Sequence, residues 1–372
     1  MNKMPTCPHF SLCSGCTLEE NLFHPPIWNE ALSFFKNASP QLEPRLHTDG
    51  FGQTRMKAKL AVRPPSHFGL FKKGTHEVLP IPDCRVHHPS INRAVSLLNK
   101  TLLQSPLSLY TENPPTGLLR YVQLAVERQS NRIQLTLVLN ASHTNPQIDA
   151  FCNALCSSDL WHSIWLNFHP QNSNTIFGPS WILIQGEPFL WHTLNQTPIA
   201  FHPAAFSQSH LSLFEKMLQQ IETWIASSTS ILELYAGVGA IGLSLHRRSI
   251  PIHLVENNPF SHLSFQESLK HFPPSEQTLF SYTCASADTI SLNSYDLIIV
   301  DPPRKGLDPQ LLRRLNDLHN VRLIYVSCGF ESFQRDTQDL LASGWRLDDA
   351  SGYLLFPGTN HVELLALFSK FS

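Results

Sequence analysis

Long apolar runs and a strong net charge are both missing from this sequence. No stretch of its 372 residues approaches the ~20 consecutive apolar residues that a membrane-spanning helix requires. The first seven residues also lack the apolar core of a secretory signal. We therefore expect a cytoplasmic protein that does not enter a membrane. The formal net charge of −2 argues against coating of nucleic acid by bulk electrostatics, but it leaves room for a local basic surface.

The sequence also contains no internal repeat and no low-complexity tract. Its length and its hydrophobic content of 42% allow two folded domains, each with its own core. Up to about residue 205, strand-like runs such as 121–126 and 133–139 are separated by turns rich in Pro, Asn and Ser. Beyond that point the pattern changes. We predict an α+β domain over residues 1–205 and a second domain over residues 206–372.

In the second domain, short apolar strands alternate with helices. Apolar residues at helical spacing predict a helix over 211–225. Strands are predicted at 231–234, 253–255, 297–300 and 321–326, with helices at 241–247, 263–271 and 309–318 between them. This alternation is typical of an α/β domain with a doubly wound parallel sheet. Ligands bind to such a sheet at the carboxyl ends of its strands.

A glycine loop follows the first of these strands. Gly237 and Gly239 stand between the strand and the next helix, and Glu256 ends the following strand. Glycines allow a ligand to approach the backbone, and a carboxylate so placed accepts hydrogen bonds from ribose hydroxyls. The short loop suits S-adenosylmethionine, which has no phosphate to bind. The alternative is a tight turn followed by an exposed glutamate.

Two further motifs follow strands, and both carry reactive side chains. Asp301-Pro302-Pro303 forms a rigid turn, and Arg304 stands where amine methyltransferases carry an aromatic residue. Cys328 follows the last predicted strand and is either a nucleophile or a small buried residue. Glu363 lies in a strand-like apolar run, where a buried carboxylate could act as a base. The alternative is an edge-strand glutamate that faces solvent.

Four cysteines in the first domain form a pattern typical of a metal site. Cys7, Cys13 and Cys16 give the spacing C-x5-C-x2-C, and Cys84 follows after a long gap. In a cytoplasmic protein, four thiolates brought together indicate a metal rather than disulfides. The spacing alone does not separate zinc from an iron–sulfur cluster.

A basic segment lies between residues 54 and 76, which include no acidic residue. Its first part alternates charged and apolar residues, so a β-strand would place four cations on one face: Arg55, Lys57, Lys59 and Arg63. This face is either solvated or in contact with nucleic acid, and the spacing favours neither.

In their order along the chain, these motifs resemble the RNA 5-methyluridine (uracil-C5) methyltransferase family of bacteria. The resemblance covers nearly the whole chain. Besides the cysteines, the basic segment and the glycine loop, it rests on Leu118-Leu119-Arg120, Phe206-Ser207-Gln208, Asp301-Pro302-Pro303-Arg304-Lys305-Gly306, Ser327-Cys328 with Arg335-Asp336, and Phe356-Pro357 with His361-Val362-Glu363.

The resemblance implies a Rossmann-like S-adenosylmethionine-dependent methyltransferase domain preceded by a domain that binds RNA and a metal cluster. Because uracil C5 is a poor nucleophile, a thiolate must first add at C6, and a base must later remove the C5 proton. By resemblance Cys328 is the nucleophile, Glu363 is the base, and the four cysteines hold a 4Fe-4S cluster rather than zinc. The residues implied to bind the cofactor are Gln208, Tyr235, Gly237, Gly239, Ala240, Glu256 and Asp301.

The resemblance also narrows the substrate. Some members of the family begin with a TRAM barrel, but here the cysteine pattern already begins at Cys7, so we expect none. This layout resembles the shorter members that act on 23S rRNA. The alternatives are the same chemistry on tRNA, or a non-catalytic RNA-binding or ribosome-assembly factor. We expect a monomer.

The sequence departs from the usual family pattern at three positions beside these motifs: Ala240, Gly329 and Phe330. The helix after Glu256 also lacks the usual face rich in Ala and Asn. Either Ser286 or Asp288 is expected to contact the cofactor after the next strand. We expect these changes to affect affinity and target choice rather than the type of reaction.

Overall fold

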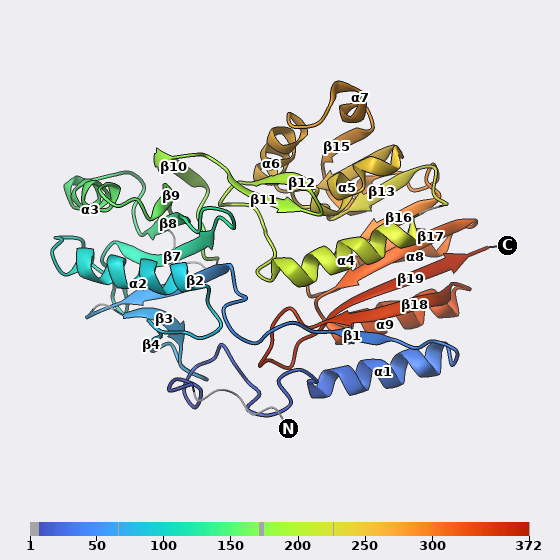
Figure 1. Cartoon of the computed structure of the whole chain (residues 1–372), viewed down its shortest axis with the longest axis horizontal. Coiled ribbons are helices and arrows are strands. Elements are labelled where there is room, and N and C mark those ends of the chain that lie inside the picture. Colours follow the sequence, from blue (N-terminus) through green and yellow to red (C-terminus); the bar gives the residue numbers. More distant parts are fainter. Residues whose placement is uncertain (1–6, 66, 171–174, 226, 372) are drawn as a thin grey trace.

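The computed structural model describes residues 7–65, 67–170, 175–225 and 227–371 and contains two large β-sheets side by side (Figure 1). The eight-stranded sheet is formed by β1 (Arg45–His47), β13 (Ile231–Leu234), β14 (Ile252–Glu256), β15 (Phe280–Cys284), β16 (Leu297–Val300), β17 (Val321–Ser327), β18 (Arg346–Tyr353) and β19 (Glu363–Lys370). The seven-stranded sheet is formed by β2 (Lys57–Arg63), β3 (His67–Phe71), β4 (Val78–Pro80), β7 (Leu119–Val126), β8 (Ile133–Leu139), β9 (Trp161–Phe168) and β10 (Ser180–Gly186).

Helices and two small hairpins complete the described chain. The hairpins are β5 (Thr111–Glu112) with β6 (Pro115–Thr116), and β11 (Leu190–Leu194) with β12 (Thr197–Phe201). The helices are α1 (Pro26–Ala38), α2 (Pro89–Leu102), α3 (Pro146–Cys156), α4 (Leu211–Trp224), α5 (Ala240–Ser244), α6 (Pro259–Leu269), α7 (Pro274–Gln277), α8 (Pro309–Asn316) and α9 (Phe330–Ala342). In the part of the chain that the structure describes, no helix combines the length and the apolar character needed to cross a membrane.

The eight-stranded sheet has the order β1-β18-β19-β17-β16-β13-β14-β15. Strands β13 to β17 are parallel, whereas β19 runs antiparallel to both of its neighbours, β17 and β18. The chain winds from β13 outward to β14 and β15 and then returns to β16 on the other side. This reversal of strand order lies between β13 and β16 and forms the crevice in which open α/β sheets bind ligands.

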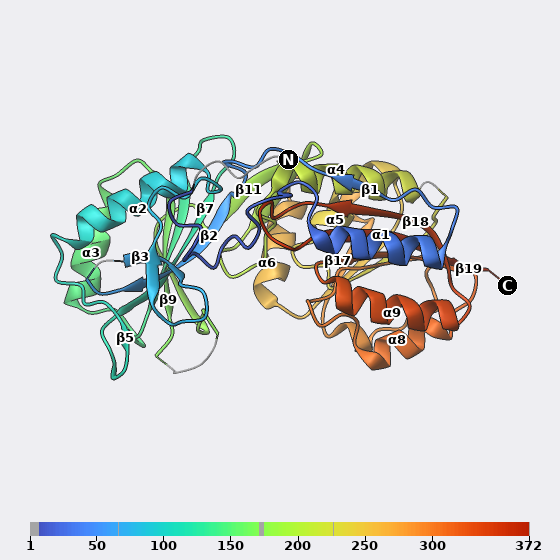
Figure 2. The ribbon, with the colours of Figure 1, turned by 90° about the horizontal axis from the view of Figure 1, so that it is seen from below.

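Alternating residues of this sheet pack into two separate cores, one on each face. Leu232 and Leu234 of β13 pack with α1, α8 and α9, whereas Ile231 packs with α4, α5, α6 and the hairpin β11–β12. Figure 2 shows α1, α8 and α9 lying together beside the strands. The sheet is therefore the middle of three layers, as the alternation of strands and helices predicts.

The seven-stranded sheet is mainly antiparallel, with the order β10-β9-β8-β7-β2-β3-β4. Among the strand pairs that the structure describes in this sheet, β8 with β9 is the parallel one, and α3 provides the crossover between them. Helices α2 and α3 pack on one face of this sheet and close a third core around Ile91, Leu98 and Phe151. Strand β2 thus lies inside the sheet, between β7 and β3.

Two segments differ from the predicted boundary at residue 205. Strand β1 pairs in parallel with β18 of the eight-stranded sheet, and α1 buries Trp28 and Phe35 in that sheet's core. The hairpin β11–β12 packs on the other face, where the amides of Ala200 and His202 donate to the hydroxyls of Ser268 and Ser264 of α6. The two sheets therefore do not correspond to residues 1–205 and 206–372. The physical reason is that an amphipathic helix needs an apolar partner, which need not be its neighbour in sequence.

We predict that Trp28→Ala lowers the free energy of unfolding by about 3–5 kcal/mol. Trp28 is 3% exposed and packs against Gly352, where a Cβ atom would lie 2.6 Å from the indole ring. Urea denaturation of the purified variant measures the effect. Leu103→Ala is the control, because Leu103 is 77% exposed and should change stability by less than about 0.5 kcal/mol. Equal unfolding midpoints for Trp28→Ala and the wild type would show that α1 is not part of the cooperative fold.

Candidate active site

The crevice between β13 and β16 contains a pocket that collects most of the predicted cofactor residues. The members of that group that line it are Gln208, Tyr235, Gly237, Ala240 and Asp301. Its other walls come from β11, β12, α4, β13, α5 and the segments between them, namely Leu194, Phe201, Phe206, Ser207, Leu211, Phe214, Glu233, Ala236, Val238 and Ile241. Residues from 194 to 301 therefore meet at the carboxyl ends of two adjacent strands.

The glycine loop has left-handed backbone at three positions. Tyr235, Gly237 and Gly239 have φ angles of 59°, 55° and 80°, and Tyr235 is the one residue of these three with a side chain to strain. Gly239 does not line the pocket. A Cβ atom there would lie 2.8 Å from Leu254, so this glycine is required by packing as well as by φ.

Glu256 faces the glycine loop from the end of β14. Its carboxylate accepts hydrogen bonds from the amide of Gly237 at 3.2 Å and from the amide of Asn258 at 2.9 Å. Glu256 is not among the residues that line the pocket, but it fixes the loop that does. The two later candidates, Ser286 and Asp288, hydrogen-bond to each other and are not among the lining residues either.

Two carboxyl groups line this pocket, of which Glu233 is buried and Asp301 is half-buried. Burial raises the pKa of Glu233, a hydrogen bond from the amide of Gly242 at 2.8 Å opposes the increase, and the proximity of Asp301 adds to it, so that the resulting pKa is about 8. Burial also raises the pKa of Asp301, and the charge of Glu256 adds to the increase. Such clustered acids with raised pKa values are typical of functional sites.

The register of two antiparallel strands brings Cys328 and Glu363 together. Ser327, the last residue of β17, pairs with Leu364 of β19. Continuing this register by one residue places Cys328 opposite Glu363, and side chains directly opposite in an antiparallel pair lie on the same face with Cβ atoms about 5 Å apart. Glu363 is buried at 4% exposure, and Cys328 is half-buried.

The charges around this pair form one electrostatic group. The pKa of the Cys328 thiol is raised to about 11, mainly by burial and also by the carboxylates of Glu363 and Asp301, whereas Arg304 opposes the increase. Burial also raises the pKa of Glu363, again reinforced by Asp301 and opposed by Arg304. Asp301 lines the cofactor pocket as well, so it connects that pocket to the cysteine.

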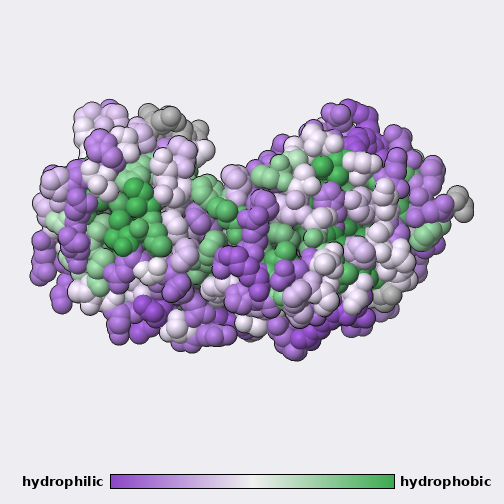
Figure 3. Space-filling model, turned by 90° about the horizontal axis from the view of Figure 1, so that it is seen from above, coloured by the Kyte–Doolittle hydropathy of each residue, from purple (hydrophilic) through white to green (hydrophobic). Residues whose placement is uncertain are grey.

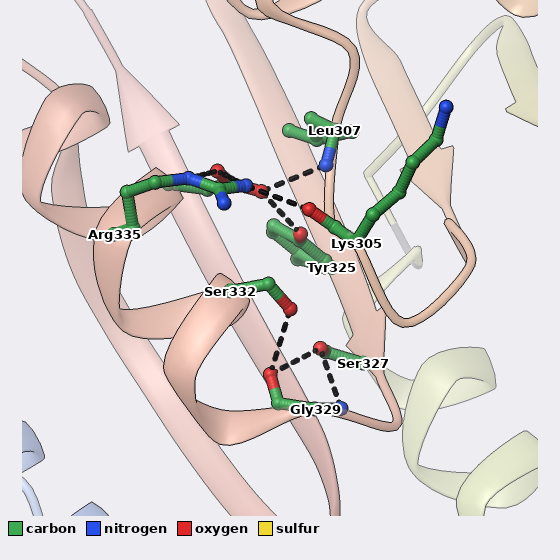
Figure 4. A network of polar contacts seen from close by, with 8 residues as sticks. Lys305, Leu307, Tyr325, Ser327, Gly329, Ser332 and Arg335 are labelled. Atoms are coloured by element: carbon green, nitrogen blue, oxygen red, sulfur yellow. Dashed lines mark hydrogen bonds and ion pairs between the residues drawn. The ribbon is translucent and has the colours of Figure 1, made fainter.

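A network below the site fixes the loops that carry these residues (Figure 4). The fully buried carboxylate of Asp336 accepts hydrogen bonds from the Tyr325 hydroxyl and the Leu307 amide, both at 2.8 Å. Arg335 donates to the same carboxylate and to the Lys305 carbonyl. Below the cysteine, the hydroxyls of Ser327 and Ser332 both donate to the carbonyl of Gly329. The loop after β16 and the turn after β17 are thus held by the start of α9.

A second, basic pocket opens beside the pair. It is lined by cations and histidines from distant segments, namely Arg55, Lys57, Lys59, His87, Arg304 and His361, together with Ser14, Gly15, Thr17, Ala58, Leu60, Leu70, Ser209, Phe356 and Thr359. None of the described residues that line it is acidic. Such a pocket attracts an anion, and Arg304 and His361 place it next to Cys328 and Glu363.

The four predicted RNA-binding residues have different environments. Arg55 and Lys59 line the basic pocket, as does Lys57, whose Nζ donates to the Ala205 carbonyl and the Ser207 hydroxyl, each at 3.2 Å. Burial lowers the pKa of Lys57 to about 7. Arg63 is buried, and its guanidinium donates to two backbone carbonyls and to Glu112. Arg63 is therefore a structural residue, because a phosphate would have to break these bonds to reach it.

The four cysteines predicted to bind metal surround a separate pocket. Cys7, Cys13, Cys16 and Cys84 all line it, together with Arg55. The pKa of Cys16 is raised to about 11, mainly by burial and also by the other thiols, whereas Arg55 opposes the increase. Within residues 7–65, 67–170, 175–225 and 227–371, no group of three or more His, Cys, Asp or Glu side chains is arranged to hold a metal ion. The predicted cluster therefore stays a prediction.

Some residues of the site carried no signal in the sequence. The hydrophobic wall of the cofactor pocket, including Leu194 and Phe201, comes from the hairpin β11–β12, whose apolar residues look like ordinary core. Lys57 could be predicted as basic, but not as a half-buried residue that fixes the segment before Gln208. Arg304 and His361 belonged to recognised motifs, and only the fold shows that they share a pocket.

Comparison with known proteins identifies the family. Residues 282–371 match the family model of tRNA (uracil-5-)-methyltransferases. The chain is 39% identical over 377 residues to an uncharacterized RNA methyltransferase of Protochlamydia amoebophila, covering 98% of this chain and 97% of that protein. An uncharacterized RNA methyltransferase of Staphylococcus epidermidis is 24% identical over 98% of this chain and 84% of its own length. The chain therefore belongs to the RNA (uracil-5-)methyltransferase family, whose members are transferases, and the family predicted from its motifs is confirmed.

The fold is shared with a solved structure. A tRNA (uracil-54, C5)-methyltransferase of Pyrococcus abyssi, solved in complex with S-adenosyl-L-homocysteine, matches with a TM-score of 0.77 and 23% identity, over 96% of this chain and 86% of that one. The match extends over both sheets, because it covers almost the whole chain. The α/β fold of an S-adenosylmethionine-dependent methyltransferase, expected for the second half of the chain, is thus confirmed.

We predict that Glu233→Gln stabilises the ligand-free protein as pH rises from 5 to 8. The wild-type carboxyl has a folded pKa of about 8, above its ordinary value of 4.5, so the folded state binds more protons between these values and loses stability as pH rises. A glutamine can still accept the Gly242 amide but does not titrate. The difference in the free energy of unfolding should grow by up to about 1.4 kcal/mol per pH unit. Urea denaturation at each pH measures it, and the exposed Glu20→Gln should show no such trend.

Proposed function

We propose that this protein methylates C5 of uridine in RNA, with Cys328 as nucleophile and Glu363 as base. The observation that carries the proposal is the β17–β19 register, which sets Cys328 opposite a buried glutamate. Family membership and the adjoining pocket at the β13–β16 crevice support the same reaction.

The pocket at the crevice suits S-adenosylmethionine, which would supply a methyl group from its sulfonium. Gln208, Tyr235, Ala240 and Asp301 line the pocket and would hold the cofactor, with Gly237 giving the backbone room to approach it. Glu256 fixes the loop through its bond to the Gly237 amide, and its carboxylate would accept hydrogen bonds from ribose hydroxyls of the cofactor. The apolar wall formed by Phe201, Phe206 and Phe214 fits the uncharged parts of such a ligand.

The residues of the pair perform the remaining steps. Cys328 loses its proton to water and its sulfur adds to C6, which moves the electron pair of the C5=C6 bond onto C5 and O4. Once C5 carries the methyl group, Glu363 takes the C5 proton. The electron pair released from that C–H bond forms C5=C6 again, and the bond from C6 to sulfur breaks. The raised pKa of Glu363 makes it a stronger base than an exposed carboxylate.

The basic pocket supports RNA as the substrate. A phosphate next to the target nucleotide would meet Arg55, Lys59 and Arg304, while the uracil reaches Cys328. The reacting carbon lies on the edge of a base that is paired and stacked inside a helix, so the uridine must leave its stack to enter. We do not include Arg63 in this surface, because its guanidinium is already occupied.

We further propose that the four cysteines hold a 4Fe-4S cluster, with zinc as the less favoured alternative. Four thiols and no carboxylate around one pocket are a donor set that suits either group. The amide of Gly15 donates to the sulfur of Cys13, and Arg55 beside the pocket would offset the negative charge of thiolates. The segment that carries the cysteines also contacts the catalytic domain, since the amides of Thr17 and Leu18 both donate to the carbonyl of Gly358. A structural or RNA-positioning role follows from that contact.

As the substrate we propose 23S rRNA, because the cysteine pattern resembles the shorter members of the family that modify it. The family model that matches residues 282–371 is that of tRNA (uracil-5-)-methyltransferases, so tRNA is the second candidate substrate. A cytoplasmic location and a monomeric state complete the proposal. Anaerobically purified protein, labelled S-adenosylmethionine and unmodified transcripts of both RNAs test the substrate. Label in 5-methyluridine of 23S transcript supports the proposal, label in tRNA alone moves the substrate, and label in neither leaves a non-catalytic RNA-binding factor.

We predict that Glu363→Gln forms the covalent RNA adduct but releases it slowly, because glutamine cannot take the C5 proton. An RNA–protein band that survives denaturing electrophoresis should accumulate, and turnover should fall by roughly 10²–10⁴-fold. Cys328→Ala should give neither adduct nor product. The exposed Cys284→Ala is the matched control and should keep activity. Methylation by Cys328→Ala at the wild-type rate would exclude the mechanism.

We predict that Cys84→Ser lowers the metal content of anaerobically purified protein, because it removes one of the four thiols that line the pocket. Iron, zinc and acid-labile sulfide per chain are the measurements. Iron with sulfide in the wild type supports the cluster, and zinc without sulfide supports the alternative. Cys156→Ser, a cysteine of α3 outside that pocket, should leave the metal content unchanged. A wild-type protein purified without either metal would contradict the prediction.

A further inference from the structure

Three half-buried aromatic residues form a continuous wall that connects the two sheets. Phe177, next to β10, contacts Trp181 of that strand with ring centroids 5.0 Å apart. Trp181 in turn contacts Phe260 of α6 at 6.0 Å. The wall therefore extends from the seven-stranded sheet to the layer that covers the cofactor pocket. Seen from above, the outline of the molecule is indented between two lobes (Figure 3).

A cation joins this wall to the proposed substrate site. The Nζ of the exposed Lys59 lies 4.6 Å from the ring centroid of Phe177. Lys59 also lines the basic pocket, which Arg304 and His361 connect with Cys328 and Glu363. Lys59 therefore connects the aromatic wall with the basic pocket, which is the proposed contact surface for the RNA.

The rings are held in place but are not closed off by packing. Behind them, the buried His202 stacks on Phe260, with centroids 4.6 Å apart and planes 14° apart, and meets Trp181 edge-on at 5.7 Å. Core aromatics of this protein are almost fully buried, as Trp161 is at 1% exposure, whereas Phe177, Trp181 and Phe260 are only partly covered. Exposed aromatic faces beside a cation are the surface on which proteins stack unpaired bases.

We propose that Phe177, Trp181 and Phe260 form a stacking surface for unpaired bases of the RNA strand next to the target uridine. This inference rests on the proposed function. Neighbouring ring planes differ by 56° and 61°, so bases on this surface could not keep the continuous stack of a helix. The occupant is therefore a splayed single strand, and its phosphates would pass Lys59.

Binding of a fluorescent single-stranded oligouridylate and of a duplex of equal length tests the surface. Trp181→Leu keeps an apolar side chain but removes the ring, and should weaken single-strand binding about tenfold. Trp181→Phe, which keeps a stacking face, should restore most of it. The salt dependence should be the same in Trp181→Leu as in the wild type, whereas Lys59→Ala should lower its slope by about one. Under methylation conditions, Trp181→Leu should raise KM for RNA and leave kcat unchanged.

Several outcomes would overturn the proposal. Wild-type affinity in Trp181→Leu, with methylation intact in both proteins, overturns the stacking surface and leaves the proposed function standing. Equal losses in Trp181→Leu and Trp181→Phe, accompanied by lower unfolding midpoints, assign the wall to structure alone. A wild-type protein that neither binds nor methylates RNA overturns the proposed function and this inference together. Phe177 lies outside any helix or strand, so the fold depends less on its ring than on that of Trp181. The variant Phe177→Leu therefore repeats the test with less risk to the fold.

Discussion

The antiparallel pairing of β17 with β19 is the constraint on which the site depends. In a purely parallel sheet, all strands begin at one edge and end at the opposite edge. The first residue of one strand could therefore not lie opposite the residue that follows the last residue of its neighbour. Because β19 runs backward, its first residue, Glu363, lies at the carboxyl edge where Cys328 leaves β17. A shift of this register by one residue would turn one of the two side chains to the other face of the sheet. Seven paired positions hold the register, from Val321 with Lys370 to Ser327 with Leu364.

The same edge gathers four acidic groups whose pKa values are all raised. Burial disfavours the ionised forms of all four groups, namely Glu233, Asp301, Glu363 and Cys328. Arg304 is the cation that lowers the pKa values of Cys328 and Glu363. The protein holds this arrangement from outside the site. The Asp336 network fixes the loops after β16 and β17, and the cysteine segment is bonded to Gly358 in the loop that leads to Glu363.

Much of the eight-stranded sheet and of the helices that cover it could be predicted from periodicity, because strands and helices each produce a local sequence pattern. The predicted strands at 231–234 and 297–300 coincide with β13 and β16, and the motifs that follow them meet at one edge, as the topology requires. Neither α9 nor β18 was predicted, although β18 provides a partner for β1. The boundary at 205 and the role of Arg63 were not predictable, because both depend on contacts between distant segments. Alternation placed Arg63 on the face of Lys57 and Lys59, but its guanidinium is occupied by Glu112 of the hairpin β5–β6 and by two backbone carbonyls, one of them from Arg120 of β7.

The departures from the family pattern also have a structural context. Helix α6 lacks the usual face rich in Ala and Asn, and the hydroxyls of its Ser264 and Ser268 accept the amides of His202 and Ala200. These bonds attach the hairpin β11–β12, which forms part of the wall of the cofactor pocket. Gly329 is the N-cap that directly precedes α9, and a Cβ atom there would lie 3.3 Å from the Arg304 carbonyl, so the loops that carry the cysteine and the arginine touch. Phe330 is buried against α1.

The position of β1 at the edge of the eight-stranded sheet has a consequence for the synthesis of the chain. Arg45 pairs with Ser351, which is made about 300 residues later, or roughly 15–60 s at 5–20 residues per second. During that interval α1 leaves the ribosome with Trp28, Ala31 and Phe35 uncovered, because the surface that buries them does not yet exist. Translation must therefore be almost complete before the first helix can dock, and the nascent chain exposes an apolar helix face for most of its time on the ribosome.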